Sequence, residues 1–151
     1  MPDHRPPPPL PDFDLDRFTP YRLAVAAQRT SEELARQYRA RFGISIPEWR
    51  VLVHLAQSGD VSVRDIEARV AMEKSKVSRA ASRLEEAGYI VKSINSTDRR
   101  LVRLALTDRG RSLMADLLPI AMAYQRDIEA RLGTMFRDFE AGLERLLSQT
   151  G

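Results

Sequence analysis

The feature that most constrains the fold of this 151-residue chain is the spacing of its apolar residues, which follows the repeat of an α-helix over most of the length. Apolar side chains recur every three or four residues over 15–58, 62–87 and 112–148, as in amphipathic helices. Segment 90–107 differs, because β-branched residues and alternating apolar and polar side chains flank a polar turn at 95–100. We therefore expect a mainly α fold with a small β-hairpin, which makes the class α+β.

Capping and stop residues divide the helical segments. A first helix begins or bends at Thr19-Pro20 and ends at Gly43. Ser45-Ile46-Pro47-Glu48 has the spacing of a capping box and opens a second helix, and Ser62-Val63-Arg64-Asp65 repeats that pattern. After a break at 71–73, another helix runs from about Lys74 to Ala87 and is stopped by Gly88. Two short helices followed directly by a hairpin have the order of a winged helix-turn-helix.

The C-terminal third is helical again. Pro119 lies inside its first apolar stripe, which predicts a kink, and Gly133 ends that helix. The last helix carries Phe136, Phe139 and Leu143 on one face. An isolated helix of this kind must bury that face against another part of the protein or against a second copy.

Composition excludes several classes of protein. The chain is 43% hydrophobic and 30% charged, which allows a buried core, and it has no cysteine and two histidines. Disulfides and thiol chemistry are therefore excluded. The two histidines, His4 and His54, lie far apart in the sequence and do not indicate a multi-histidine metal site. No apolar run approaches the roughly 18–20 residues that cross a bilayer, and the N-terminus lacks the pattern of a secretory signal. We expect a cytoplasmic protein with no metal, no cofactor and no membrane contact.

Catalytic patterns are also missing. The sequence contains no Gly-rich phosphate loop, no Gly-x-Ser-x-Gly elbow and no metal-ligand spacing. Its carboxylates mostly lie at helix caps or in amphipathic charge rows, whereas acid–base catalysis needs them together in a cleft. We therefore expect no enzyme and no catalytic residues.

Basic residues are concentrated in the middle of the chain. Residues 62–111 contain 12 Lys or Arg and 7 Asp or Glu, a net charge of +5, whereas the other 101 residues carry −2. Such a distribution favours a polyanionic partner. On charge alone, a solvated basic surface without a partner explains this distribution of charge equally well.

The helix that begins near Lys74 has the pattern of a DNA-reading helix. At about 100° per residue, Val77, Ala80, Leu84 and Ala87 fall on one side and face the core. Small hydroxyl residues and Arg79 occupy the opposite side, where Arg79 offers the bidentate donors that pair with guanine. Basic residues at its edges are long enough to reach phosphates. The candidate contacts in this motif are Arg64, Lys74, Ser75, Lys76, Ser78, Arg79, Ser82 and Arg83.

The hairpin turn adds Asp98, Arg99 and Arg100 to the candidate DNA contacts. A narrow minor groove concentrates negative potential and attracts inserted arginine. Asp98 cannot bind phosphate, and we expect it to bond to the turn backbone or to orient Arg100. The alternative is a solvent-exposed turn with no partner.

These motifs together resemble the MarR family of winged-helix transcription regulators. The resemblance covers everything except the proline tail, and two residues depart from the family pattern, Ala71 where glycine is common and Glu73 where serine or aspartate often caps. The matching residues are Lys74-Ser75-Lys76-Val77-Ser78-Arg79, Arg83-Leu84-Glu85, Gly88, Asp98-Arg99-Arg100, Leu104, Leu106-Thr107 and Gly110.

The resemblance implies a homodimer that binds double-stranded DNA at a pseudo-palindromic operator, usually as a repressor. It implies an N-terminal dimerisation helix (12–45), a winged helix-turn-helix (46–111) and C-terminal dimerisation helices (112–151). The consecutive prolines of 1–11 separately predict a disordered Pro-rich tail. A winged-helix module that binds protein without reading DNA sequence is the alternative.

A small-molecule effector is the last implied partner. Regulators of this family often release DNA when an aromatic or anionic ligand binds between the dimerisation helices and the winged domain. Tyr21, Arg22, Trp49 and His54 are the candidates for that site, because an arginine near aromatic side chains can hold a carboxylate over an apolar wall. Core packing of Trp49 and His54 is the simpler explanation of those two.

Overall fold

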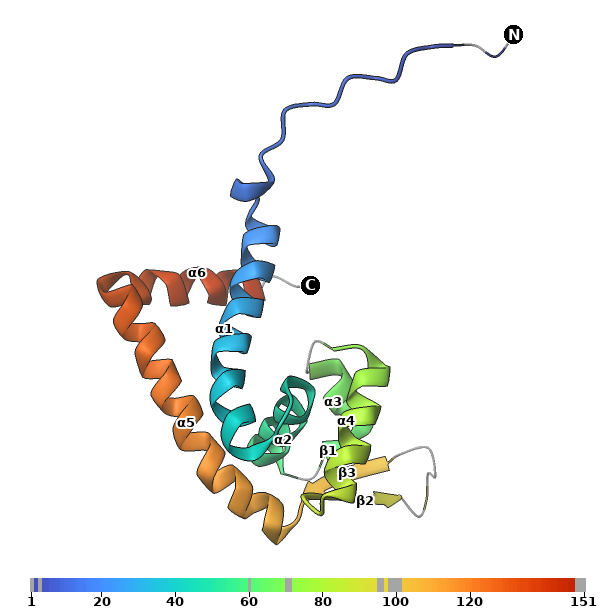
Figure 1. Ribbon diagram of the computed structural model, residues 1–151, viewed down its shortest axis with the longest axis vertical. Helices are drawn as coiled ribbons and strands as arrows, with labels where there is room; N and C mark the ends of the chain where they lie inside the picture. Colours follow the sequence, from blue (N-terminus) through green and yellow to red (C-terminus); the bar gives the residue numbers. More distant parts are fainter. Residues whose placement is uncertain are drawn as a thin grey trace.

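The computed structural model describes residues 2, 4–59, 61–69, 72–94, 97 and 102–148. Helices dominate the described residues, with one small sheet of three short strands (Figure 1). The predicted mainly α fold with a β-hairpin is therefore confirmed. In chain order the elements are the 3₁₀ turn η1 (Leu15–Arg17), α1 (Thr19–Phe42), α2 (Ile46–Ser58), β1 (Val61–Ser62), α3 (Val63–Arg69), α4 (Lys74–Glu86), β2 (Ile90–Ile94), β3 (Val102–Leu106), α5 (Asp108–Leu132), the 3₁₀ turn η2 (Gly133–Met135) and α6 (Phe136–Ser148).

The elements form a compact head and a long helical frame. Helices α2, α3 and α4 gather with the sheet in the head, while α1 and α5 lead away from it and α6 crosses between their far ends (Figure 1). The proline-rich segment before η1 extends away from the rest of the chain (Figure 1). The head and the frame correspond to the two kinds of segment that the sequence predicts, a winged helix-turn-helix and flanking helices.

The sheet has three antiparallel strands in the order β1-β3-β2. The predicted hairpin is β2 and β3, with Ile90 opposite Leu106 and Ile94 opposite Val102. Strand β1 adds a short edge, where Val61 lies opposite Leu104. Sequence patterning does not predict β1, because two residues are too few to show an alternation.

The core of the head is apolar and includes one face of α4. The largest fully buried side chains include Leu52, Leu55, Ile66 and Leu104. On α4 the buried residues are Val77, Ala80, Ala81 and Leu84. The prediction that Ala87 also faces the core was wrong, because the helix ends at Glu86 and Ala87 is its exposed C-cap.

Hydrogen bonds and a close backbone contact fix the connection between the sheet and α5. The Thr107 hydroxyl donates to the carbonyl oxygen of Gly88 at 2.6 Å and accepts the N–H of Gly110 at 3.1 Å, so it caps α5. The Thr107 N–H also donates to the carbonyl of Tyr89. A Cβ on Gly110 would overlap that same Tyr89 oxygen, so the close approach requires glycine. The hairpin is therefore held against the start of the long frame helix.

The frame helices leave apolar surface uncovered. Helix α5 continues through Pro119 as one element. Helix α6 has no buried residue, and the exposed fractions of Phe139, Leu146 and Leu147 are 44%, 52% and 70%. Within the described part of the chain, none of the helices is both long enough and apolar enough to span a bilayer.

Candidate nucleic-acid interface

Helix α4 presents the predicted polar face to solvent. All seven of its candidate contacts are exposed, and so is Arg64 on α3. Val77 and Leu84 are fully buried on the opposite side. The separation of a basic, hydroxyl-rich face from an apolar face leaves the first free to enter a groove. The seven exposed residues on α4 are Lys74, Ser75, Lys76, Ser78, Arg79, Ser82 and Arg83.

Polar contacts set the position of α4 in the head. The Nε of Arg83 lies 3.3 Å from Oε1 of Glu48 on α2, and this oxygen also accepts the Ser45 hydroxyl at 2.7 Å. Ser45 caps α2 by accepting the Glu48 N–H. The Arg83 side chain remains 51% exposed, so it joins α4 to α2 while it keeps a surface toward solvent.

The turn into α4 depends on backbone groups. Ser62 caps α3 by accepting the N–H of Asp65 at 3.1 Å, as its spacing predicts. Glu73 is the N-cap residue of α4, and its carbonyl accepts the N–H groups of Lys76 and Val77. Its side chain makes no capping hydrogen bond. The Glu73 carboxylate therefore lies exposed beside the reading face.

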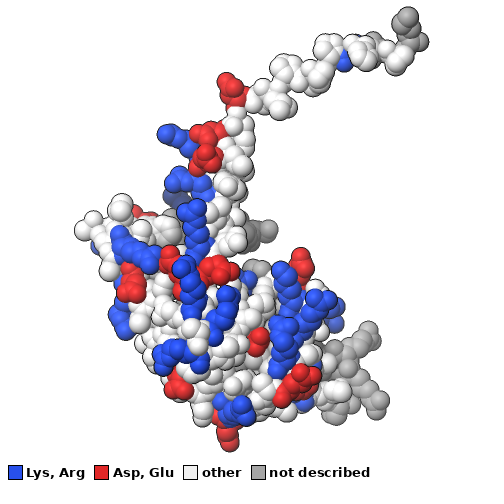
Figure 2. Space-filling model, in the orientation of Figure 1, with Lys and Arg blue, Asp and Glu red and all other residues white. Residues whose placement is uncertain are grey.

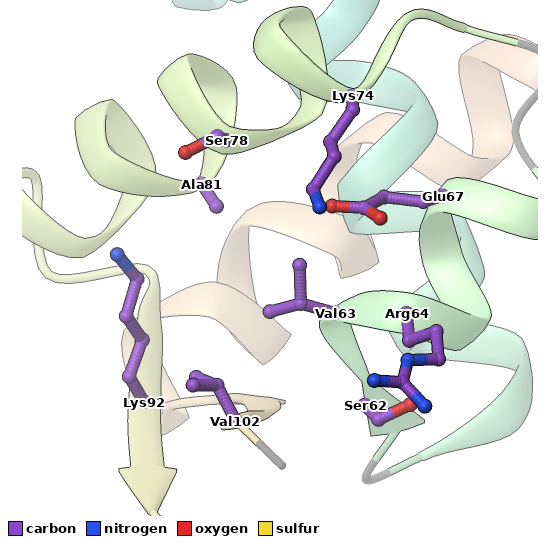
Figure 3. Close-up of a pocket in the computed structure, with 9 residues that line it drawn as sticks. All are labelled: Ser62, Val63, Arg64, Glu67, Lys74, Ser78, Ala81, Lys92 and Val102. Atoms are coloured by element: carbon purple, nitrogen blue, oxygen red, sulfur yellow. The ribbon is translucent and has the colours of Figure 1, made fainter. Parts of the chain in front are cut away.

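A hollow of about 330 Å³ separates α3, α4 and the sheet (Figure 3). Apolar side chains and Ala81 form part of its wall, and cationic side chains from three elements line it. Lys92 on β2 belongs to this hollow and is absent from the sequence-predicted contacts. The lining residues are Ser62, Val63, Arg64, Glu67, Lys74, Ser78, Ala81, Lys92 and Val102.

Positive side chains gather over this part of the head. Figure 2 shows a cluster of Lys and Arg over α3 and α4, next to the hairpin. The predicted wing contacts Asp98, Arg99 and Arg100 lie outside the described residues. The strands that lead to them are placed, because β2 ends at Ile94 and β3 begins at Val102. Strands β2 and β3 therefore lie next to the cationic cluster.

The four candidate effector residues lie in two places. Tyr21 and Arg22 line a shallow hollow of about 470 Å³ on α1, which also contains Arg29 and Arg131 but neither Trp49 nor His54. Trp49 stacks on Tyr38 with ring centroids 5.5 Å apart, and both belong to the packing around the core. The structure therefore does not bring the four together in one hollow, and their shared role stays a prediction.

His54 is half-buried on α2. Burial lowers the pKa of His54 below its ordinary value, and the nearby charge of Arg69 lowers it further. A histidine in this setting favours the neutral form, which suits core packing better than the binding of an anion.

A cluster that the sequence does not reveal joins α1 to α5. The Tyr124 hydroxyl donates to Oε2 of Glu33 at 2.6 Å, and Nη1 of Arg131 donates to the same oxygen at 2.9 Å. These hydrogen bonds hold the pKa of Glu33 below its ordinary value. Burial, together with the bond to Glu33, raises the pKa of Tyr124 to about 12. Glu33 and Tyr124 are 91 residues apart, so no local pattern could predict the pair.

An apolar groove of about 560 Å³ lies between α1, α5 and α6. Most of its lining is aliphatic or aromatic, and it includes the inner face of the last helix. The apolar lining residues of the groove include Leu23, Ala26, Ala27, Ile128, Leu132, Phe136, Phe139 and Leu143.

No group of three potential metal ligands occurs among the residues that the structure describes.

Comparison with known proteins relates this head to DNA-binding regulators. A model of the MarR family matches residues 42–101. The transcriptional repressor MdtR of Bacillus subtilis is 35% identical over 68 residues, which are 45% of this chain and 44% of MdtR. The chain spans about half the length of the first curated relatives that it matches.

Solved structures extend the likeness beyond the head. A MarR/EmrR family transcriptional regulator from Acinetobacter sp. ADP1 is 26% identical with a TM-score of 0.78, covering 90% of this chain and 96% of that one. BpsR of Bordetella bronchiseptica, whose DNA binding is regulated by 6-hydroxynicotinic acid, is 23% identical with a TM-score of 0.77, covering 93% and 100%. At the latter identity the similarity concerns the fold.

Proposed function

Because the chain belongs to the MarR family through its winged helix-turn-helix, matched over residues 42–101, we propose that it is a sequence-specific DNA-binding transcriptional regulator. The observation that carries the proposal is the exposed face of α4, on which hydroxyl side chains and Arg79 lie between basic edges. A helix of this kind fits the major groove, where arginine pairs with guanine through two hydrogen bonds. Lysines at the edges supply contacts to phosphate.

We further propose that two copies act together. The uncovered apolar face of α6 and the groove beside α1 and α5 support this proposal, because contiguous exposed apolar surface marks interaction sites. A symmetric dimer places two reading helices about 34 Å apart, one turn of DNA, and therefore selects a pseudo-palindromic site. Residues 12–45 and 112–151 supply the dimer contacts in this proposal, and residues 46–111 bind DNA.

The salt dependence of DNA binding tests the proposal against the alternative, a winged-helix module that binds protein. With several phosphate contacts, the logarithm of the association constant falls linearly with the logarithm of the salt concentration, by about 0.9 for each contact. We expect a steep slope and a preference among duplexes at moderate ionic strength, measured by fluorescence anisotropy. Weak binding that is equal for all duplexes would favour the protein-binding module.

We also propose that the protein represses transcription and that binding of a small ligand releases it from DNA. The name of MdtR, a repressor, supports the direction of regulation, and the control of BpsR by 6-hydroxynicotinic acid supports an aromatic acid as ligand. In this chain, Arg22 and Tyr21 line one hollow and could hold such a carboxylate against an aromatic ring. Trp49 and His54 do not line that hollow and stay the other two predicted effector residues.

Trp49 provides a direct readout, since it is the only tryptophan in the chain. We expect an aromatic acid that binds near Trp49 to change its fluorescence and to weaken DNA binding over the same concentration range. Arg22→Gln should raise the concentration needed, whereas Arg137→Gln on α6 removes the same charge outside that hollow and should not. A broad panel of aromatic acids that changes neither Trp49 fluorescence nor DNA binding would contradict the effector proposal.

A further inference from the structure

We propose that residues 5–11 form a docking motif for a partner protein whose binding groove is lined with aromatic side chains and carries carboxylates at one end. The docking motif lies before the frame helices and outside the winged helix-turn-helix, so the inference does not depend on DNA reading. Its sequence is Arg5-Pro6-Pro7-Pro8-Pro9-Leu10-Pro11.

Proline sets the backbone conformation of the docking motif. Four consecutive prolines remove N–H donors and hold φ near −65°, which favours a polyproline II helix and excludes an α-helix or the centre of a sheet. The structure agrees, because residues 4–11 belong to no helix or strand and the segment is extended (Figure 1). A segment that is stiff before it binds loses little conformational entropy when it docks.

The docking motif is open to solvent along its whole length. Every residue from 4 to 11 is exposed, and the exposed fraction of Leu10 is 91%. Five proline rings and a leucine in seven consecutive residues make a contiguous apolar surface. Such a surface, left in water, marks an interaction site.

A short structured segment fixes the point from which the docking motif leaves the protein. Phe13 packs edge to face on Phe18, with ring centroids 5.1 Å apart, and Asp14 caps η1 by accepting the N–H of Asp16 at 3.1 Å. The docking motif therefore ends beside a folded turn, at the end of α1 that is remote from the head (Figure 1). A partner bound there leaves the reading face of α4 free.

The threefold repeat of polyproline II divides the docking motif into three edges. Three residues complete one turn and the rise is about 3.1 Å per residue, so residues three apart lie on the same edge. The first edge holds Arg5, Pro8 and Pro11, the second holds Pro7 and Leu10, and the third holds Pro6 and Pro9.

The first two edges fit a groove with two apolar pockets. The pairs Pro7-Pro8 and Leu10-Pro11 lie one turn, or about 9 Å, apart along the helix. Each pair offers a compact apolar unit to a pocket between aromatic rings, which is how such grooves recognise proline-rich segments. The third edge faces away from the groove and only keeps the helix stiff.

Charge gives the docking motif a direction. Arg5 lies at one end of the first edge, and Asp12 follows Pro11 at the other end. A guanidinium pairs with a carboxylate through two parallel hydrogen bonds, whereas a second carboxylate is repelled. The partner groove therefore carries its carboxylates at the Arg5 end, which selects one of the two directions in which a polyproline helix can lie.

Titration of the full-length protein with an SH3 domain that selects Arg-x-x-Pro-x-x-Pro ligands tests the docking motif, because that domain has the proposed groove chemistry. Calorimetry should show saturable binding that Pro8→Ala and Pro11→Ala each weaken about tenfold or more, and Arg5→Gln several-fold. Pro9→Ala is the matched control, since it removes one proline from the third edge and should change the affinity little. No binding, or equal losses in Pro8→Ala and Pro9→Ala, would overturn the docking motif.

The same variants identify the natural partner. The full-length protein, with a photo-crosslinking amino acid at position 4, is produced in its native cells. We expect a crosslinked protein whose yield falls in Pro8→Ala and Pro11→Ala and persists in Pro9→Ala. The purified partner should bind the variants with the same order of affinities. The absence of a crosslink, or a crosslink that these substitutions do not change, would overturn the proposal.

A second copy of this chain is the alternative occupant, because the groove between α1, α5 and α6 also contains aromatic side chains. Removal of residues 2–11 separates the two cases. With an external partner, the shortened protein should lose binding to the SH3 domain and keep its mass in sedimentation and its affinity for DNA. Conversion of dimers to monomers would assign the docking motif to the dimer and overturn the external partner. A failure of both proteins to bind DNA would overturn the proposed function alone.

Discussion

Removal of residues 134–151 is expected to convert a dimer into a monomer and to abolish tight binding to DNA. The deleted segment includes α6, which has no buried residue in the single chain and exposes Phe139, Leu146 and Leu147. Its loss therefore costs the fold of the head little, while it removes apolar surface that two copies can share. A monomer engages one half-site, and loss of bivalent binding reduces affinity by about 10²–10⁴-fold.

Sedimentation and DNA titration of the truncated protein check this result, with circular dichroism to verify the fold. Phe139→Glu places a charge on the apolar face of α6 and should also give monomers. Arg137→Glu introduces glutamate on a polar, exposed position of the same helix and should leave the dimer intact. A truncated monomer that binds DNA with full affinity would refute the dimer.

Replacement of Arg79 by alanine is expected to relax the sequence preference of the protein. The Arg79 side chain lies on the exposed face of α4, where a bidentate contact to guanine distinguishes one base pair from the others. Its loss should cost about 1–3 kcal/mol on the preferred duplex and much less on a duplex altered at that base pair. The two affinities should therefore converge.

Two matched variants separate base reading from charge. Arg79→Lys keeps the positive charge but loses the planar pair of donors, so it should also relax the preference. Lys76→Ala removes a charge at the edge of the same face and should weaken all duplexes about equally. If Arg79→Ala weakens every duplex by the same factor, Arg79 is a phosphate contact and does not read sequence.

Much of the fold could be predicted from local pattern. Long amphipathic repeats and glycine stops locate the helices, and the alternation in 102–107 locates the hairpin, because both depend on residues that are neighbours in sequence. The family predicted from the motifs of 62–110 is confirmed by the family match. Strand β1 and the end of α4 escaped prediction, since β1 forms only by pairing with β3 and helix ends vary by a residue or two.

Some residues of the candidate site could likewise be predicted from the sequence, and others could not. The exposed face of α4 follows from helical geometry, so its residues could be selected from sequence alone. Lys92 and Glu67 could not, because the hollow exists only after α3, α4 and β2 pack together. The bond between Tyr124 and Glu33 likewise depends on the packing of two helices that are far apart in the chain.

Selection of duplexes from a random pool by the full-length protein tests the central claim most directly, namely that α4 reads DNA sequence from a symmetric dimer. At moderate ionic strength, sequencing of the bound fraction should reveal a pseudo-palindrome whose half-sites lie about 10 base pairs apart. Arg79→Ala should lose the preference at one position of each half-site. A bound fraction with the same sequence composition as the starting pool would contradict the account.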